Sequence, residues 1–296
     1  MTAGRACANG AISIVNAIVT GRYGASLAVD LHTQAKVTLL EDVPEVEVII
    51  NGDEAEDPLL ARLVLKAVVA RLGQPDWGGR VETTSDIPAS RGLKSSSAAA
   101  NAIALAANQA FMHYEGRALS RGELLDAAIE AALDAGVTIT GAFDDATASL
   151  NGGISVTDNV ERKVLHREDA PVDLDIILVV PDAKTRTASV RDLPYAPFAP
   201  LAREAHRLAQ TGRWMDALTL NGLVAGSLYG VPASWTREAL AAGAACAGVS
   251  GTGPAFAAVC DADHAKAVES ALASSAPDAR ILRTRPTNER ASEVVR

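Results

Sequence analysis

The chain has 296 residues, of which 48% are apolar and 21% are charged, a composition typical of a globular protein with a sizeable core and not of a disordered chain. The net charge of −9 argues against nucleic acid as a partner, and no apolar run reaches the roughly 18 residues that span a bilayer, so we expect no membrane partner either. Three cysteines without a C-x-x-C pair argue against disulfides or zinc, and the first residues lack the apolar core of a signal peptide, so we expect a cytoplasmic protein.

The first third of the chain reads as strands with one helix. Residues 3–18 combine small and apolar side chains, which favours a buried strand with a close backbone approach; a strand with a turn at Asn9 and Gly10 fits equally well. Further strands are expected at 25–40, 46–50 and 80–84, and a helix at 57–72.

Residues 85–100 form the most informative stretch of the sequence. Pro88 and Gly92 favour a loop, and the serines and alanines from Ser95 onward favour a helix that begins there and continues to about residue 113. The unpaired N–H groups of such a helix start, with Lys94 beside them, make a seat for an anion such as phosphate. An ordinary capped helix is the alternative. The chain has neither a P-loop motif nor a G-x-G-x-x-G motif.

A second stretch, residues 136–153, carries the adjacent acids Asp144 and Asp145. It follows a helix expected at 120–135, which opens with a capping box between Ser120 and Glu123. Small and apolar residues flank the two acids, and carboxylates are rarely buried unless a partner such as a cation or a substrate hydroxyl meets them. The alternative is an exposed helix start, where acids suit the helix dipole.

The charged run at 159–173 predicts a domain boundary, with one domain at 1–165 and a second at 166–296. Around it we expect strands at 154–157, 163–166 and 174–180. Lys184, Arg186 and Arg191 follow; they could hold an anionic substrate, or they belong to a solvated loop. Helices are expected at 200–210, 214–229 and 234–246.

A third glycine-rich stretch runs from Gly248 to Phe256 and leads into an apolar strand at 255–260. Glycines there allow the backbone to approach a phosphate or another loop. A helix at 263–273 and a strand at 280–284 complete the expected elements, and the charged tail from Pro286 is expected to be loose.

Taken together, these three stretches resemble the GHMP small-molecule kinases. The central motif of that family, Pro-x-x-x-Gly-Leu-Gly-Ser-Ser-Ala-Ala, stands here at residues 88–99 with one extra serine and with Lys94 in place of a glycine. The loop at 248–256 resembles the third motif of the family, and residues 187–194 resemble a substrate-side loop of homoserine kinases. The sequences of residues 8–18, 93–102 and 139–146 are similar to those of the archaeal-type shikimate kinases, which are unrelated in fold to the P-loop shikimate kinases.

The resemblance implies an α+β, two-domain GHMP kinase fold, in which the N-terminal domain is like domain 2 of ribosomal protein S5 and the C-terminal domain is ferredoxin-like. It also implies transfer of a phosphoryl group from ATP, with Mg2+, to the 3-hydroxyl of shikimate. The expected partners are therefore ATP and shikimate, and the expected assembly is a monomer or a homodimer. Homoserine or mevalonate as the acceptor, or a non-catalytic metabolite sensor of the same fold, are the alternatives.

The resemblance also assigns roles to residues. Asp145 matches the catalytic aspartate, because Ser149 lies four residues on. Ser97, or Ser96 given the insertion, matches the magnesium-side serine, and Asp134 stands where the family has a magnesium glutamate, with Glu130 as the fallback. The residues expected to bind the nucleotide are Pro88, Ser90, Arg91, Gly92, Leu93, Lys94, Ser95, Ser96, Ser97 and Ala98.

One departure from the family concerns the cation beside the catalytic aspartate. Other members carry a Lys or Arg in their first motif, at a place that matches Ala11 here, so Lys94 or Arg5 is expected to substitute. Arg191, Arg186 and Arg22, in that order, are candidates for the substrate carboxylate. The residues expected to bind the substrate are Asn9, Asp145, Arg186, Thr187, Arg191, Gly251, Thr252 and Gly253.

Overall fold

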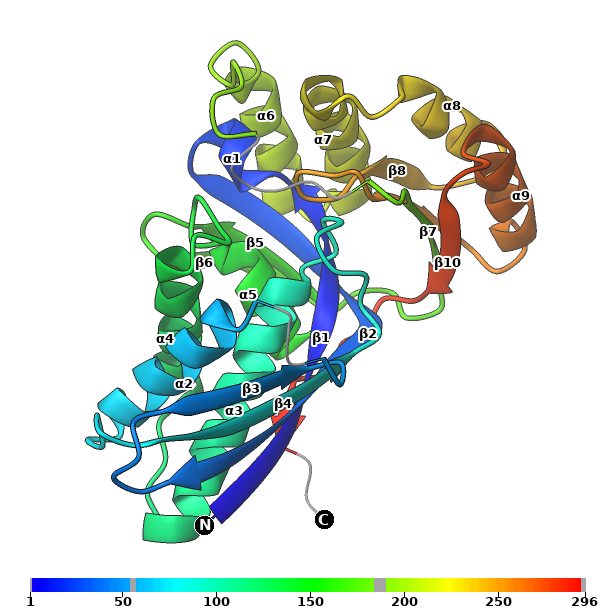
Figure 1. The fold of residues 1–296 in the computed structure, drawn as a ribbon. Coiled ribbons are helices and arrows are strands. Elements are labelled where there is room, and N and C mark those ends of the chain that lie inside the picture. Colours follow the sequence, from blue (N-terminus) through cyan, green and yellow to red (C-terminus); the bar gives the residue numbers. More distant parts are fainter. Residues whose placement is uncertain (1, 54–56, 184–189, 294–296) are drawn as a thin grey trace.

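A computed structural model describes residues 2–53, 57–183 and 190–293, and in this part of the chain the strands form two sheets (Figure 1). The larger sheet has the order β11-β1-β2-β4-β3, with β5 on β2 and β6 on β5. The long strands β1 and β2 run through its centre, and a β-bulge lies at Asn9 and Gly10, where a turn was the alternative. Its strands are β1 (Thr2–Val15), β2 (Tyr23–Leu40), β3 (Val46–Ile50), β4 (Gly78–Ser85), β5 (Ile154–Asp158), β6 (Lys163–Glu168) and β11 (Ser292–Glu293).

Three helices pack together on this sheet: α2 (Leu59–Arg71), α3 (Ser95–Glu115) and α4 (Arg121–Asp134). Alanines from the middle of α3 are almost completely buried, which lets this helix lie close to β1; a Cβ on Gly4 would come within 2.1 Å of the Ala106 carbonyl oxygen. The predicted capping box at Ser120 and Glu123 is confirmed. The buried face of α3 therefore holds the helix in place, and its first turn is left free for another role.

The second sheet has the order β10-β7-β9-β8, with all neighbours antiparallel, which is the ferredoxin-like order that the resemblance implied. Alternate residues of β7 face opposite ways. Ile176 and Leu178 pack toward α6, α7 and the central strands of the first sheet, whereas Ile177 and Val179 pack toward α8 and α9. The elements are β7 (Asp175–Val180), α6 (Ala199–Gln210), α7 (Trp214–Tyr229), α8 (Ala233–Ala241), β8 (Cys246–Val249), β9 (Phe256–Cys260), α9 (Ala265–Ser275) and β10 (Arg280–Thr284).

Two expectations for the C-terminal half were wrong. The helix expected at 234–246 ends at Ala241, because Gly243 adopts a φ of 102° and Cys246 already pairs with β9. The tail from Pro286 is not loose: the backbone of Thr287 bonds to Ala28 and Gly153, and β11 pairs with β1. The chain thus crosses back onto the first sheet after β10. A boundary near residue 165 stays a prediction.

In the described ranges, no helix has both the length and the apolar character needed to cross a membrane.

Candidate active site

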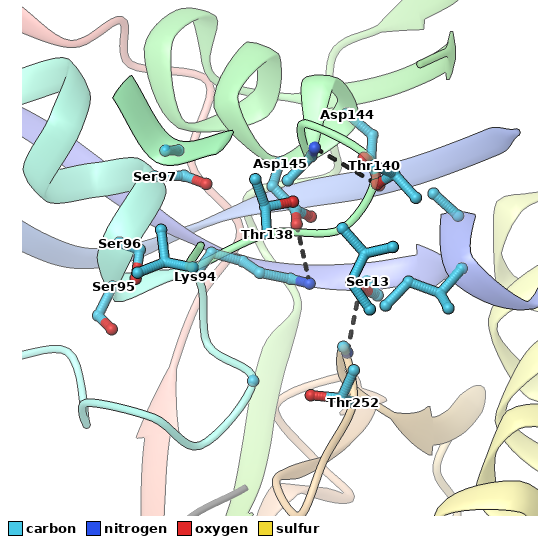
Figure 2. Close-up of a pocket in the computed structure, with 18 of the residues that line it drawn as sticks. Ser13, Lys94, Ser95, Ser96, Ser97, Thr138, Thr140, Asp144, Asp145 and Thr252 are labelled. Atoms are coloured by element: carbon cyan, nitrogen blue, oxygen red, sulfur yellow. Dashed lines mark hydrogen bonds and ion pairs between the residues drawn. The ribbon is translucent and has the colours of Figure 1, made fainter. Parts of the chain in front are cut away.

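A cavity of about 650 Å3 lies where the three predicted stretches meet, between the two sheets. Three helices begin at its wall: α3, α5 (Phe143–Asn151) and the short α1 (Ala17–Thr20). The starts of α3 and α5 have no side-chain cap, so their unpaired N–H groups favour negative charge at this wall, whereas the Asn16 side chain caps α1. Its lining includes Ser13, Asn16, Ser90, Gly92, Lys94, Ser95, Ser96, Ser97, Thr138, Thr140, Asp144, Asp145, Gly251 and Thr252 (Figure 2).

The start of α3 supplies free donors to this cavity. Lys94 occupies the N-cap position in a left-handed conformation, with a φ of 63° and no side-chain cap. The first backbone N–H of the helix that is paired inside it belongs to Ala98, which bonds to the Lys94 carbonyl. The hydroxyls of Ser95, Ser96 and Ser97 have no partner among the described residues. A polyanion at this point would meet N–H and O–H donors that nothing else uses.

The glycine-rich loop of the C-terminal half holds the phosphate-side loop in position. The Ser250 hydroxyl donates to the Gly92 carbonyl at 2.7 Å, and the Ala255 N–H donates to the Arg91 carbonyl at 2.9 Å. The approach is close enough that a Cβ on Gly92 would lie 2.2 Å from the Ser250 carbonyl oxygen. From β1, Ser13 accepts from the Gly251 N–H at 3.1 Å. The glycine-rich loop, itself held by β1, thus fixes the loop that precedes α3.

Asp145 faces the start of α3 across the cavity. Its Oδ2 lies 3.0 Å from the Lys94 ammonium, and both side chains are about nine-tenths buried, with 10% and 11% of their surface exposed. Its Oδ1 accepts from the Ser26 hydroxyl on β2 at 2.5 Å. Figure 2 shows the Lys94 side chain reaching from the loop to this carboxylate. A carboxylate held this way is placed to take a proton from an alcohol bound between it and the serines.

Asp144 is the more deeply buried of the two acids, with 3% of its surface exposed. The Asn159 amide donates to its Oδ1 at 2.7 Å, and Ser26 contacts its Oδ2 at 3.1 Å. Burial raises the pKa of Asp144 to about 7, and the negative charge of Asp145 adds to the effect. The two adjacent acids therefore have different environments, as different roles require.

Several predicted residues line this cavity together: Ser90, Gly92, Lys94, the three serines, Asp145, Gly251 and Thr252. Others support the loop from behind, because Leu93 and Ala98 are buried in the core. Arg5 is exposed and its backbone N–H bonds to Gln109, near the far end of α3, so Lys94 and not Arg5 supplies the cation beside Asp145. Pro88, Arg91 and Gly253 belong to the two loops but do not line the cavity.

Some expected substrate and metal residues lie elsewhere. The Asn9 amide donates to the Ser149 and Glu289 carbonyls, which gives it a structural role. Arg191 and Asp134 are exposed and do not line the cavity, and Arg22 pairs with Asp158 outside it. Glu130 pairs with Arg71 and Arg162. Arg186 and Thr187 lie outside the described residues.

Sequence reasoning missed four polar residues of the site: Ser13, Ser26, Thr138 and Thr140. Each of Ser13 and Ser26 has apolar neighbours on both sides in its strand, which marks it as unusual but does not show what it faces. Thr138 and Thr140 lie in the loop before α5. A helix start at the two acids was the alternative expectation, and the structure has it, although both acids are buried and not exposed. Asn16 also belongs to the site: its amide donates to the Gly251 carbonyl and its Oδ1 caps α1.

Comparison with known proteins agrees with this architecture. The sequence-family model for the GHMP kinases N terminal domain matches residues 59–153. The family model for the GHMP kinases C terminal domain matches residues 198–278. A crystal structure of homoserine kinase from Cytophaga hutchinsonii superposes with a TM-score of 0.78 at 20% identity, over 99% of this chain and 98% of that one. Fold and cavity together define a small-molecule kinase of the GHMP class.

Curated relatives narrow the class to one branch. A shikimate kinase of Methanosarcina mazei is 39% identical over 290 residues, which cover 96% of this chain and 94% of the relative. A shikimate kinase of Thermococcus kodakarensis is 40% identical over 255 residues, with 86% and 91% covered. The chain belongs to the GHMP kinase family, in the branch that contains these archaeal shikimate kinases.

Proposed function

We propose that this protein transfers the γ-phosphoryl group of ATP to the 3-hydroxyl of shikimate, giving shikimate 3-phosphate and ADP. One observation carries the proposal: the ion pair between Asp145 and Lys94 lines the same cavity as the uncapped start of α3. The identity to archaeal shikimate kinases over most of the chain supports the choice of acceptor. A cavity of about 650 Å3 is in the range of small-molecule sites.

The residues of the cavity divide the work of an in-line transfer. The N–H groups and hydroxyls of residues 95–97 hold the polyphosphate, and the ammonium of the neighbouring Lys94 pairs with the acid. Asp145 orients the attacking hydroxyl and takes its proton. Phosphoryl transfer asks little covalent chemistry of the protein, so positioning and charge stabilisation account for most of the acceleration.

Magnesium fits this site as an ion carried by the nucleotide. The described residues contain no group of three or more His, Cys, Asp or Glu side chains able to hold a metal by themselves. Mg2+ keeps several waters and is usually held by one or two protein ligands together with substrate phosphates. We assign this ligand role to the hydroxyl of Ser97, or to that of Ser96. Bound there, the ion would neutralise charge on the phosphates.

The carboxylate of shikimate needs a cation, and Lys94 is the one basic side chain among the described residues that line the cavity. Lys94 is already engaged with Asp145. We therefore keep Arg191, and Arg186 after it, as the proposed carboxylate partners on the chemical ground that an arginine pairs with a carboxylate in a bidentate way; Arg191 does not line the cavity, and Arg186 lies outside the described residues. An Arg191→Ala variant with an unchanged KM for shikimate would contradict the first assignment.

The proposed function is tested by following ADP release with shikimate, homoserine and mevalonate as separate acceptors. ADP release with shikimate alone is the expected result, and Asp145→Asn should lower kcat about 100-fold or more while ATP still binds. Turnover with homoserine or mevalonate would contradict the assignment of shikimate as the acceptor. No turnover with any acceptor would favour a metabolite sensor. Identification of shikimate 3-phosphate by mass spectrometry completes the test.

A further inference from the structure

One hydroxyl lies between the two acids of the site. The Ser26 Oγ is 2.5 Å from Oδ1 of Asp145 and 3.1 Å from Oδ2 of Asp144. A serine hydroxyl has a single proton, so it can donate to only one of these oxygens at a time. Two hydrogen bonds at once therefore require a second proton, carried by one of the two carboxyl groups.

The surroundings place that proton on Asp144. Asp145 pairs with the Lys94 ammonium, whereas Asp144 is the more deeply buried acid, and burial favours its protonated form. The Asn159 amide donates to Oδ1 of Asp144 and so leaves Oδ2, the oxygen that faces Ser26, as the position for the proton. The strand β2 packs closely against this carboxyl group, because a Cβ on Gly24 would lie 2.4 Å from the Asp144 carboxyl carbon.

Few other charges reach Asp144. Among the described residues, the charged groups that act on it are Asp145 on its own helix and Lys94 before α3. The neutral Ser26 faces it from β2, and the neutral Asn159 faces it from the segment after β5. Asn159 is held in turn by the Thr157 hydroxyl at 2.6 Å. The ionisation of Asp144 therefore depends on this small set of groups.

We propose that the proton which Asp145 takes from the substrate hydroxyl passes through Ser26 to Asp144. The inference rests on the proposed function, because it needs an alcohol that loses a proton. The step begins with Asp144 ionised. As the new O–P bond forms and the bond from the γ-phosphorus to ADP breaks, the substrate O–H bond breaks and its proton goes to Oδ1 of Asp145. That proton then moves to Ser26 Oγ while the Ser26 proton moves to Oδ2 of Asp144, which restores the protonated form of Asp144 described above. Asp145 is then a carboxylate again, and Ser26 and Asp144 are positioning residues that act through it.

The relay ends on a group that can hold the proton near neutral pH, because burial brings the pKa of Asp144 to about 7. Asp145 keeps its ion pair with Lys94 after each turnover. Asp144 must be ionised before it can receive the proton, so the rate of phosphoryl transfer should rise with pH through this range.

An Asp144→Asn variant tests the relay, because the asparagine amide resembles a protonated carboxyl of the same size. Single-turnover rates of transfer from ATP to shikimate are measured between pH 6 and pH 8, so that product release does not mask the chemical step. The wild-type rate should rise about tenfold over this range, as expected for a group with a pKa of about 7. The variant should stay at the low-pH rate of the wild type throughout.

A Ser26→Ala variant interrupts the same relay without touching either acid, and it decides the question if Asp144→Asn does not fold. Ser155 offers a matched control, since it lies opposite Ser26 on β5, is equally buried and has an unpartnered hydroxyl. Ser26→Ala should lose the rise with pH, and Ser155→Ala should keep it. Carbon-13 NMR should show the Asp144 carboxyl titrating near pH 7 in the wild type and in Ser26→Ala.

The outcomes separate the relay from the proposed function. No transfer to shikimate by the wild type would contradict the proposed function. With transfer established, a flat wild-type profile, a rise that survives in Asp144→Asn or Ser26→Ala, or an Asp144 carboxyl that titrates only at acid pH would overturn the relay.

Discussion

Replacement of Lys94 by methionine removes the ammonium beside Asp145 and keeps most of the side-chain volume. The two charges are 3.0 Å apart, so their attraction amounts to about 5.5 kcal/mol at an effective dielectric constant of 20, before desolvation is subtracted. Loss of one partner from such a buried pair costs about 3–5 kcal/mol. We expect kcat to fall about 100-fold to 1000-fold, as when one preorganised charge-stabilising group is removed.

The backbone of Lys94 supplies an internal control. Its φ of 63° is a conformation that glycine adopts at little cost, whereas other residues pay about 1–2 kcal/mol for it. Lys94→Gly and Lys94→Ala both lack the ammonium and should be equally inactive. In urea denaturation, however, the glycine variant should be more stable than the alanine variant by about 1 kcal/mol.

Single-turnover transfer and urea denaturation, measured on the same three variants, test both halves of this reasoning. If Lys94→Met retains a rate within about threefold of the wild type, the ammonium has no part in the chemical step. If the glycine and alanine variants are equally stable, the left-handed conformation of this residue is wrong.

Three further predictions concern other parts of the molecule. Gly92→Ala should lower the free energy of unfolding by about 2–4 kcal/mol, because the new Cβ would lie 2.2 Å from the Ser250 carbonyl oxygen of the facing loop. Gly116→Ala is the control: its φ is also positive but nothing lies within 4 Å, so it should lower the free energy of unfolding by only about 1 kcal/mol. The Arg283 guanidinium lowers the pKa of the buried Asp175, so the ion pair stabilises the fold in full above the ordinary carboxyl value of 3.8. This contribution is lost progressively as pH falls below 3.8 and through the lowered pKa of the folded state. Arg283→Met should cost about 1–3 kcal/mol at pH 7 and less at pH 3, in urea denaturation at both pH values. Ser97→Ala should raise the Mg2+ concentration needed for half-maximal activity about tenfold, and an unchanged requirement would leave this hydroxyl without a metal role.

Local sequence signals predicted the elements that carry their own start and stop residues. The helix from Ser95, the capping box at Ser120 and the long strand β2 are of this kind. The errors lie where distant pairing decides the outcome. Cys246 follows an alanine-rich helix and would continue it by propensity, but it pairs with β9, and the polar tail after Pro286 is ordered by backbone bonds to residues more than a hundred positions away.

The same distinction holds for the site. Asp145 and the serines at 95–97 were predicted because each stands in a motif with its own local chemistry, and the structure brings them to one cavity. Ser26 could not be predicted as their partner, because a single serine in a strand gives no indication of which helix crosses it. Nor does the sequence show that Asp144 points into the protein while Asp145 points to Lys94.

The position of Lys94 also explains why β1 has no basic residue at the place where the resemblance would put one. Ala11 is completely buried there, and it packs with Ala28 and Ala148 in a cluster of three alanines, which leaves no volume for a long side chain. The backbone of Ala11 meets the Leu93 carbonyl, directly before Lys94, at 3.4 Å. The cation beside Asp145 therefore comes from Lys94, in the loop before α3, and not from β1. The glycine position of the motif thus carries a lysine, at a cost in backbone strain that its ion pair with Asp145 offsets.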